Sequence, residues 1–121
     1  MTVVATVGTT HPLAFAGLAF ALLALEEEGV RPVCVVAGVT AQDAGRVYAR
    51  RALDAQTIAA QFTALRAVPV AAFHVGALLS EEAVRAVAAG LAPFSLPAET
   101  TVPGADGRFA SEGDRPSPSL F

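Results

Sequence analysis

The sequence contains no lysine, and all eight of its basic residues are arginine. Enzymes that form a Schiff base with a carbonyl substrate need a lysine amine, and so do nucleotide-binding loops of the Walker type. This chain therefore supplies neither kind of chemistry. The net charge is −3, and no run of basic residues is present. A nucleic acid is accordingly not expected as a partner.

Cysteine is nearly absent, because Cys34 is the single example. One cysteine allows no internal disulfide and suggests a reducing compartment. Cys34 lies in an apolar run and is interpreted as a small buried hydrophobic residue. The uncharged residues 13–25 are too few to span a bilayer, which takes about 20 residues, and no basic segment typical of a signal peptide precedes them. We therefore expect a cytoplasmic protein with no membrane partner.

Hydrophobic residues are abundant, at 54%, while charged residues make up only 16% of the 121 positions. This balance favours one folded domain with a modest core over a disordered chain. From residue 97 onward proline and glycine alternate with polar residues. We therefore predict an ordered domain over residues 1–96 and an irregular or disordered tail over residues 97–121.

Apolar runs and helical periodicity alternate along the ordered part. We predict strands at residues 3–7, 31–39 and 70–75, and a fourth strand that begins at residues 94–96. Helices are predicted at residues 13–28, 55–67 and 80–91. A polar loop at residues 40–46 leads into an extended piece at residues 47–51. Asp54 and Ser80 are suitable N-cap residues for the second and third helices, and Gly29 ends the first. This order predicts a three-layer α/β fold with a mostly parallel sheet.

The most distinctive turn follows the first predicted strand and contains Gly8, Thr9, Thr10 and His11. A turn from a strand into a helix gathers free backbone N–H groups and the positive end of the helix dipole. Ligands of open α/β sheets bind at such carboxyl ends of strands. These residues are therefore candidates for ligand binding. The alternatives are that Thr9 and Thr10 are helix caps and that the backbone alone requires Gly8.

Three further candidates, Gln42, His74 and Gly76, follow or end the second and third predicted strands. The Gln42 amide can offer both a donor and an acceptor to a ring edge, although it could also be a solvent-exposed loop residue. His11 and His74 are chemically capable of acid–base catalysis, but neither has a carboxylate partner near it in sequence. We therefore assign no catalytic residue. Asp43 is interpreted as a turn residue, and no spacing of ligands indicates a metal site.

Taken together, these motifs resemble the N-terminal half of the hydroxymethylpyrimidine and phosphomethylpyrimidine kinases of thiamine biosynthesis, which have a ribokinase-like fold. The resemblance covers about residues 1–96 and rests on three collinear segments: Gly8-Thr9-Thr10 followed by Ala16-Gly17, then Thr40-Ala41-Gln42-Asp43, then residues 69–78. The resemblance implies that Gly8, Thr9, Thr10, His11, Gln42, His74 and Gly76 lie on the substrate side of such a fold.

Several positions depart from the family pattern. The glycine-rich turn is replaced by residues 11–15, the aspartate of the family's Gly-Ser-Asp is Thr10, and the lysine of its third strand is His74. Nothing in residues 97–121 resembles the family's C-terminal half, which carries most of the ATP site and the catalytic base. We therefore expect a truncated relative that binds a pyrimidine or another small ligand but is not an active kinase alone. ATP and Mg²⁺ would be needed only if a partner chain completed it.

Two alternatives follow from the same sequence. One is a structural or interaction protein that works as a homodimer or larger oligomer, with residues 13–25 buried against a second subunit, because uncovered apolar faces and strand edges are normally paired. The other is a kinase completed by a partner chain.

Overall fold

A computed structural model describes residues 1–14, 16–94 and 98–100 of the chain. Its elements are β1 (Val3–Thr10), α1 (Gly17–Glu27), β2 (Arg31–Gln42), β3 (Val47–Ala52), α2 (Ala55–Leu65), β4 (Val70–Val75), α3 (Glu81–Leu91) and β5 (Ala98–Thr100). None of the helices in these ranges is long and apolar enough to traverse a membrane.

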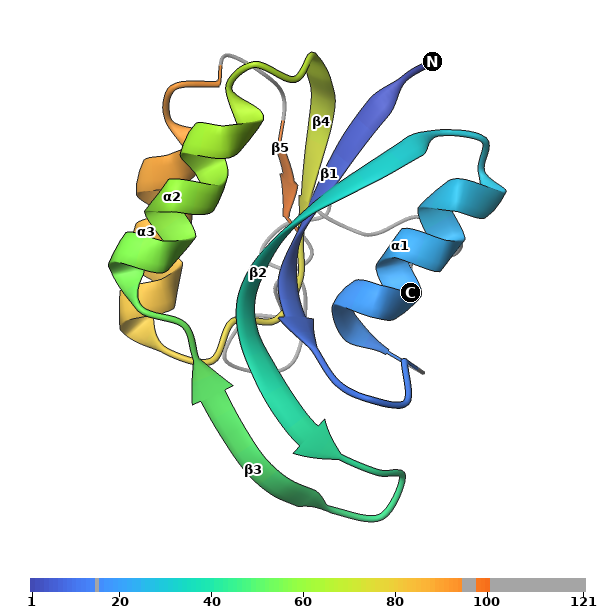
Figure 1. The fold of residues 1–121 in the computed structure, drawn as a ribbon, viewed down its shortest axis with the longest axis vertical. Helices are drawn as coiled ribbons and strands as arrows, with labels where there is room; N and C mark the ends of the chain where they lie inside the picture. The colour runs from blue at the N-terminus through green and yellow to red at the C-terminus, as the bar shows by residue number, and fades with distance from the viewer. Residues whose placement is uncertain (15, 95–97, 101–121) are drawn as a thin grey trace.

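The strands form a five-stranded sheet in the order β3-β2-β1-β4-β5. Every neighbouring pair is parallel except β2 and β3, which are antiparallel. Helix α1 covers one face of the sheet, and α2 and α3 cover the other (Figure 1). The predicted three-layer α/β architecture with a mostly parallel sheet is therefore confirmed.

The larger core lies between the sheet and helices α2 and α3. Phe62 of α2 packs against Phe73 of β4 with ring centroids 6.1 Å apart, and Phe94 meets the edge of Phe73 at 4.9 Å. Helix α3 approaches this cluster closely because Gly90 has no side chain. A Cβ built on Gly90 would stand 2.5 Å from Cγ of the Phe62 ring.

The caps of α2 and α3 agree with the sequence. Asp54 accepts a hydrogen bond from the backbone N–H of Thr57 at 2.8 Å, and Ser80 accepts one from Ala83 at 3.0 Å. Helix α1 begins differently, at Gly17 rather than at residue 13, and its N-cap Ala16 makes no side-chain capping bond. The prediction that Thr9 or Thr10 caps this helix is wrong, because both residues still belong to β1.

The second strand is longer than predicted, since residues 40–42 continue β2 instead of forming a loop. The reason is β3, which turns back and pairs with Gly38–Gln42 of β2. Asp43 forms the turn, as predicted: its Oδ1 accepts hydrogen bonds from the N–H groups of Gly45 and Arg46 at 2.8 and 2.9 Å. The pKa of Asp43 lies below its usual value, chiefly because the Tyr48 hydroxyl donates a hydrogen bond to the carboxylate. The two backbone hydrogen bonds lower this pKa further.

Two boundaries near the end of the ordered part also differ from prediction. Helix α2 ends at Leu65 rather than at residue 67. The last strand begins at Ala98 instead of residues 94–96, and it pairs in parallel with β4 inside the segment assigned to the tail. The remainder of the predicted tail, residues 101–121, lies outside the described residues.

The side chain of Gln61 from α2 occupies part of the outer edge of β2. Its Nε2 donates to the carbonyl oxygen of Val36, and its Oε1 accepts from the N–H of Val36, both at 2.8 Å. Strand β3 pairs with β2 only from Gly38 onward. The amide of Gln61 therefore satisfies backbone groups that no strand reaches.

Candidate functional site

A hollow of about 120 Å³ lies between α1 and the carboxyl ends of β1 and β4. Its lining comes from three segments that the sheet and the first helix bring together. The lining residues are Thr6, Val7, Gly8, Thr9, Gly17, Leu18, Ala21, His74, Gly76 and Ala77. This is the edge of the sheet at which open α/β proteins bind their ligands.

Alternation along β1 explains which residues face the hollow. Successive side chains of a strand point to opposite faces, and Ala5 and Val7 belong to the core on the side of α2 and α3. Thr6 and Gly8 consequently point toward α1. His74 lies directly opposite Thr6 in the parallel register of β1 and β4, so it faces the same side.

A buried polar pair forms one wall of the hollow. Thr6 and His74 are only 1% and 4% exposed, and a hydrogen bond of 3.0 Å joins Oγ1 of Thr6 to Nδ1 of His74. Burial lowers the pKa of His74 to about 4. The imidazole is therefore neutral at neutral pH, and in that form it presents one nitrogen donor and one nitrogen acceptor.

The segment after β4 is tied to β1 by two further hydrogen bonds. The Thr9 hydroxyl donates to the carbonyl oxygen of Ala77 at 3.0 Å, and the N–H of Gly76 donates to the carbonyl oxygen of Val7 at 2.8 Å. These bonds hold the two strand ends side by side and fix the floor of the hollow.

Gly8 and Gly76, unlike the third glycine of the hollow, keep space open rather than relieve backbone strain. Neither Gly8 nor Gly76 has a positive φ. A Cβ on Gly8 would have its nearest neighbour at 3.8 Å, and one on Gly76 at 3.7 Å, which are ordinary contacts. The expectation that the backbone alone requires Gly8 is therefore wrong. An alanine would fit at position 8, but its methyl group would occupy part of the hollow in front of Thr6 and His74.

The structure brings together four of the seven predicted binding residues: Gly8, Thr9, His74 and Gly76. Thr10 pairs with Val39 inside the sheet, and His11 is buried beyond the end of β1; neither lines the hollow. Gln42 lies at the tip of β2, where the hairpin extends past the end of β1 (Figure 1), and its Oε1 accepts from Thr40 at 2.6 Å. These three residues lie outside the hollow, and their part in ligand binding stays a prediction.

Thr6 belongs to the wall of the hollow, but it is not among the binding residues predicted from the sequence. The signal was present, because Thr6 is the one polar residue within the apolar run of residues 3–7. A hydroxyl inside a strand covered on both faces needs a buried hydrogen-bond partner. In this fold His74 fills that role.

No charged side chain lines the hollow in the described part of the chain. Among the described residues no three His, Cys, Asp or Glu side chains are grouped so that they could hold a metal ion. The polar groups that face the hollow are hydroxyls, a neutral imidazole and backbone groups.

The buried imidazole predicts that stability falls in acid. The unfolded imidazole has a pKa of about 6.5, whereas the folded one titrates at about 4. As the pH falls from 6.5 toward 4, protons bind preferentially to the unfolded chain, so His74 alone should lower the free energy of unfolding by about 2–3 kcal/mol. Urea unfolding at neutral and acid pH should show a smaller loss in His74→Gln than in the unmodified chain. Equal losses in the two proteins would contradict this role for His74.

Comparison with known proteins gives one family. Residues 12–100 match the family described as phosphomethylpyrimidine kinase. No curated protein matches the chain.

Solved structures of two kinds of vitamin kinase resemble the chain. A phosphomethylpyrimidine kinase from Clostridium difficile 630 superimposes with a TM-score of 0.79 at 19% identity, over 95% of this chain and 52% of that protein. An ADP complex of Bacillus subtilis pyridoxal kinase gives 0.74 at 19% identity, over 84% and 40%. The Staphylococcus aureus pyridoxal kinase with AMP-PCP and pyridoxal gives 0.73 at 15% identity, over 85% and 38%. The chain thus spans about half the length of the first of these proteins and less of the other two. At such low identity the likeness shows the ribokinase-like fold.

Proposed function

Since this chain belongs to the phosphomethylpyrimidine kinase family, we propose that the hollow between α1 and the ends of β1 and β4 binds one small, uncharged heteroaromatic ring. A hydroxymethyl-bearing pyrimidine or pyridine is the class that suits it. We further propose that the described residues hold such a ring without transferring phosphate to it. The observation that carries the proposal is the buried Thr6–His74 pair at the wall of an open hollow.

The size of the hollow supports a small ligand. Pockets for drug-sized molecules usually measure about 300–1,000 Å³, while a cavity of about 150 Å³ holds a benzene ring. At about 120 Å³, this open hollow is somewhat smaller than that cavity, so one ring is the most it can hold and the ring's substituents would lie at its mouth. A nucleotide would have to bind elsewhere.

The chemistry of the walls supports a ring with hydrogen-bonding edges. Leu18 and Ala21 of α1 offer apolar contact on one side. Thr6 and neutral His74 lie on the other side, and ring nitrogens or a hydroxymethyl group would share or replace the hydrogen bonds that these two side chains already make. Gly8 and Gly76 leave the approach to this pair unobstructed by side chains.

Binding without phosphoryl transfer is supported by the charge of the site. Phosphoryl transfer depends on cationic groups and metal ions that neutralise the charge developing on the phosphate. The described lining of the hollow is uncharged at neutral pH. The arginines of β3, Arg50 and Arg51, are exposed on the far side of β2 from β1.

Calorimetry tests the proposal directly. Titration with hydroxymethylpyrimidine, and separately with pyridoxal, should give a dissociation constant on the order of 0.1–1 mM for at least one ring, which is reasonable for so few ligand atoms. Gly8→Ala should weaken binding about tenfold or more while leaving the urea midpoint nearly unchanged, because the added methyl fits the fold but occupies the hollow. Gly45→Ala on the hairpin makes the same change far from the hollow and should bind normally.

Two results would overturn the proposal. One is the absence of heat with either ring at millimolar concentration. The other is ADP formation when the chain alone is incubated with ATP, Mg²⁺ and hydroxymethylpyrimidine, which would show that its residues do transfer phosphate.

A second candidate function is interaction between copies of the chain, because α1 presents large apolar side chains to solvent. It does not exclude ligand binding, since the hollow lies on the opposite, sheet-facing side of the same helix.

A further inference from the structure

The hydrogen bond between Thr6 and His74 can run in either direction while the imidazole stays neutral. In one arrangement Oγ1 of Thr6 donates to a bare Nδ1 of His74, and the ring proton lies on Nε2. In the other arrangement a protonated Nδ1 donates to Oγ1, and Nε2 carries no proton. The direction matters for a ligand, because Nε2 is a donor in the first arrangement and an acceptor in the second.

The surroundings of Thr6 distinguish the two arrangements. The Thr6 side chain is 1% exposed, so water reaches almost none of it. Thr6 lies on β1 between Cys34 of β2 and His74 of β4, where the backbone groups of the three strands bond to one another in the ladders. In the described part of the chain the Thr6 hydroxyl makes one hydrogen bond, the 3.0 Å contact with Nδ1 of His74.

The hydroxyl proton of Thr6 therefore has one acceptor within reach, which is a bare Nδ1. If the hydroxyl accepted from Nδ1 instead, its own proton would be buried without a partner and would carry the full cost of removal from water. This cost should favour the first arrangement by about tenfold or more. We therefore assign the donor role to Thr6 and the proton of the neutral imidazole to Nε2 of His74.

We propose that Thr6 is a positioning residue: it holds His74 in the tautomer that carries the proton on Nε2, and it thereby makes the hollow select rings that offer a hydrogen-bond acceptor. The selectivity rests on the function proposed above, because it concerns the ring that the hollow binds. Any hydrogen bond that His74 makes through Nε2 is one in which it donates, and a ligand would share or replace it. A ring nitrogen with a lone pair and the oxygen of a hydroxymethyl group are both suitable acceptors.

The same tautomer disfavours two other kinds of ring. A ring that presents its own N–H group would set a donor against the Nε2–H donor, and one of the two would stay unsatisfied. A ring with only C–H edges would keep its apolar contact with Leu18 and Ala21 but would gain no hydrogen bond from His74. Pyrimidines and unprotonated pyridines are therefore the class that this wall selects.

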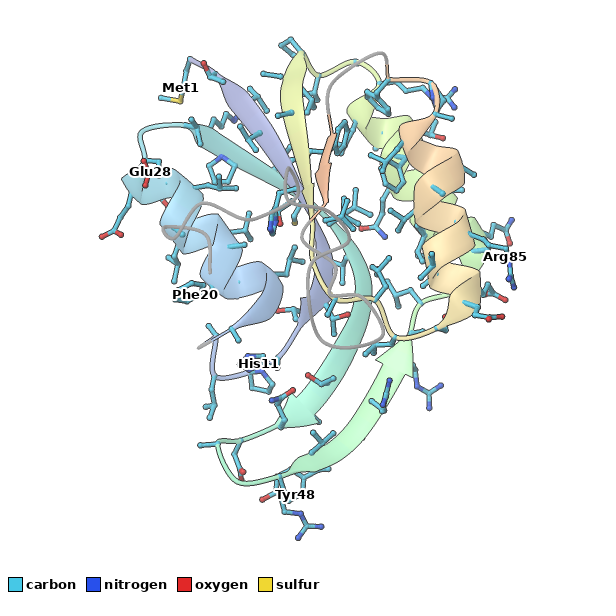
Figure 2. The ribbon with its side chains drawn as sticks, turned by 180° about the vertical axis from the view of Figure 1, so that it is seen from behind. Met1, His11, Phe20, Glu28, Tyr48 and Arg85 are labelled. Atoms are coloured by element: carbon cyan, nitrogen blue, oxygen red, sulfur yellow. The ribbon has the colours of Figure 1, made fainter. Side chains whose placement is uncertain are left out.

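Nitrogen NMR of the ligand-free protein tests the tautomer. The chain contains two histidines, and His11 lies past the end of β1, in the turn toward α1 (Figure 2). The signals of His74 are those that disappear in His74→Gln. At neutral pH this imidazole is uncharged, because burial lowers the pKa of His74 to about 4. We expect a protonated Nε2 and a bare Nδ1 in about 90% or more of the molecules.

Two variants separate the hydroxyl of Thr6 from the shape of its side chain. Thr6→Val keeps the shape and removes the donor, so the tautomers should mix and the signals of the two ring nitrogens should approach each other. Thr6→Ser restores the hydroxyl and should restore the Nε2–H form. Thr9→Val is the matched control for the spectrum of His74, which it should leave unchanged. Thr9 also lines the hollow, but its hydroxyl donates to the carbonyl oxygen of Ala77.

Calorimetry with two matched rings tests the selectivity. The probes are 5-(hydroxymethyl)pyrimidine and benzyl alcohol, which share the six-membered ring and the hydroxymethyl group and differ only in the two ring nitrogens. The unmodified protein should bind the pyrimidine about three- to tenfold more tightly than benzyl alcohol, as one added hydrogen bond allows. Thr6→Val should lose most of this preference, and Thr6→Ser should keep it.

The proposal fails if His74 of the unmodified protein carries its proton on Nδ1, or if Thr6→Val leaves the tautomer as it was. It also fails if benzyl alcohol binds as tightly as the pyrimidine. Absence of binding by both rings would overturn the selectivity together with the proposed function. The spectra of the ligand-free protein would still decide whether Thr6 positions His74.

Discussion

Replacement of Gly17 by alanine is expected to lower the free energy of unfolding by about 3–5 kcal/mol. Gly17 has a φ of +71°, and a Cβ at this position would stand 2.5 Å from the carbonyl oxygen of Thr9. The left-handed conformation costs a residue with a side chain about 1–2 kcal/mol. The clash adds to this because the obstacle is backbone, which cannot move aside by changing a rotamer. Helix α1 would have to move away from β1, and the hollow that both elements line would change with it.

Gly29→Ala is the matched control for Gly17→Ala. Gly29 has a φ of +81°, but a Cβ there would meet no atom within 4 Å. Its replacement should cost only the conformational term, about 1 kcal/mol. Urea unfolding of both variants separates the two contributions. Equal losses at the two glycines would show that the contact with Thr9 is unimportant.

Phe62→Ala should have an effect of similar size, lowering the free energy of unfolding by about 3–5 kcal/mol. Phe62 is 2% exposed and packs against Phe73. Removal of its ring would leave a cavity between α2, α3 and the sheet that the surrounding backbone cannot fill completely. Chemical denaturation followed by circular dichroism measures the loss, and a change below about 1.5 kcal/mol would indicate that the core relaxes into the space.

The Phe62 ring should reverse the usual effect on stability of replacing a helical glycine, Gly90, by alanine. Alanine normally stabilises a helix interior by about 1 kcal/mol relative to glycine. Here the new methyl group would collide with the Phe62 ring, with Cγ at 2.5 Å and Cε2 at 2.6 Å, so Gly90→Ala should destabilise the chain by about 1–3 kcal/mol. In the Phe62→Ala background the collision disappears, and Gly90→Ala should become stabilising. A double-mutant cycle tests this change of sign; additive effects would contradict it.

Local patterns in the sequence were sufficient to predict the layers of the fold and most of its helices. Asp54 and Ser80 cap their helices as expected, because capping depends on residues three positions apart. The alternation of apolar strands and helices fixed the parallel part of the sheet, since such connections permit few topologies.

The ends of the strands could not be predicted in the same way, because they depend on partners far along the chain. Gln42 belongs to a strand only because β3 folds back beside it. Thr9 belongs to β1 because it pairs with Gly38 of β2, and its hydroxyl reaches Ala77, 68 residues away. For the same reason, Thr6 stands out in the sequence as a polar residue in an apolar run, but its place in the wall follows only from His74 lying opposite it.

The pairing of Gln61 with Val36 has a consequence for how the chain behaves among other chains. An unpaired strand edge can recruit a strand from another molecule and so begin aggregation. The two hydrogen bonds of the Gln61 amide occupy the backbone groups of Val36, just before the part of β2 that β3 covers. Gln61 thus denies an incoming strand the backbone groups of one residue, while β3 covers β2 only from Gly38 onward. Loss of the Gln61 side chain would therefore extend the open edge of β2 by the donor and the acceptor of Val36.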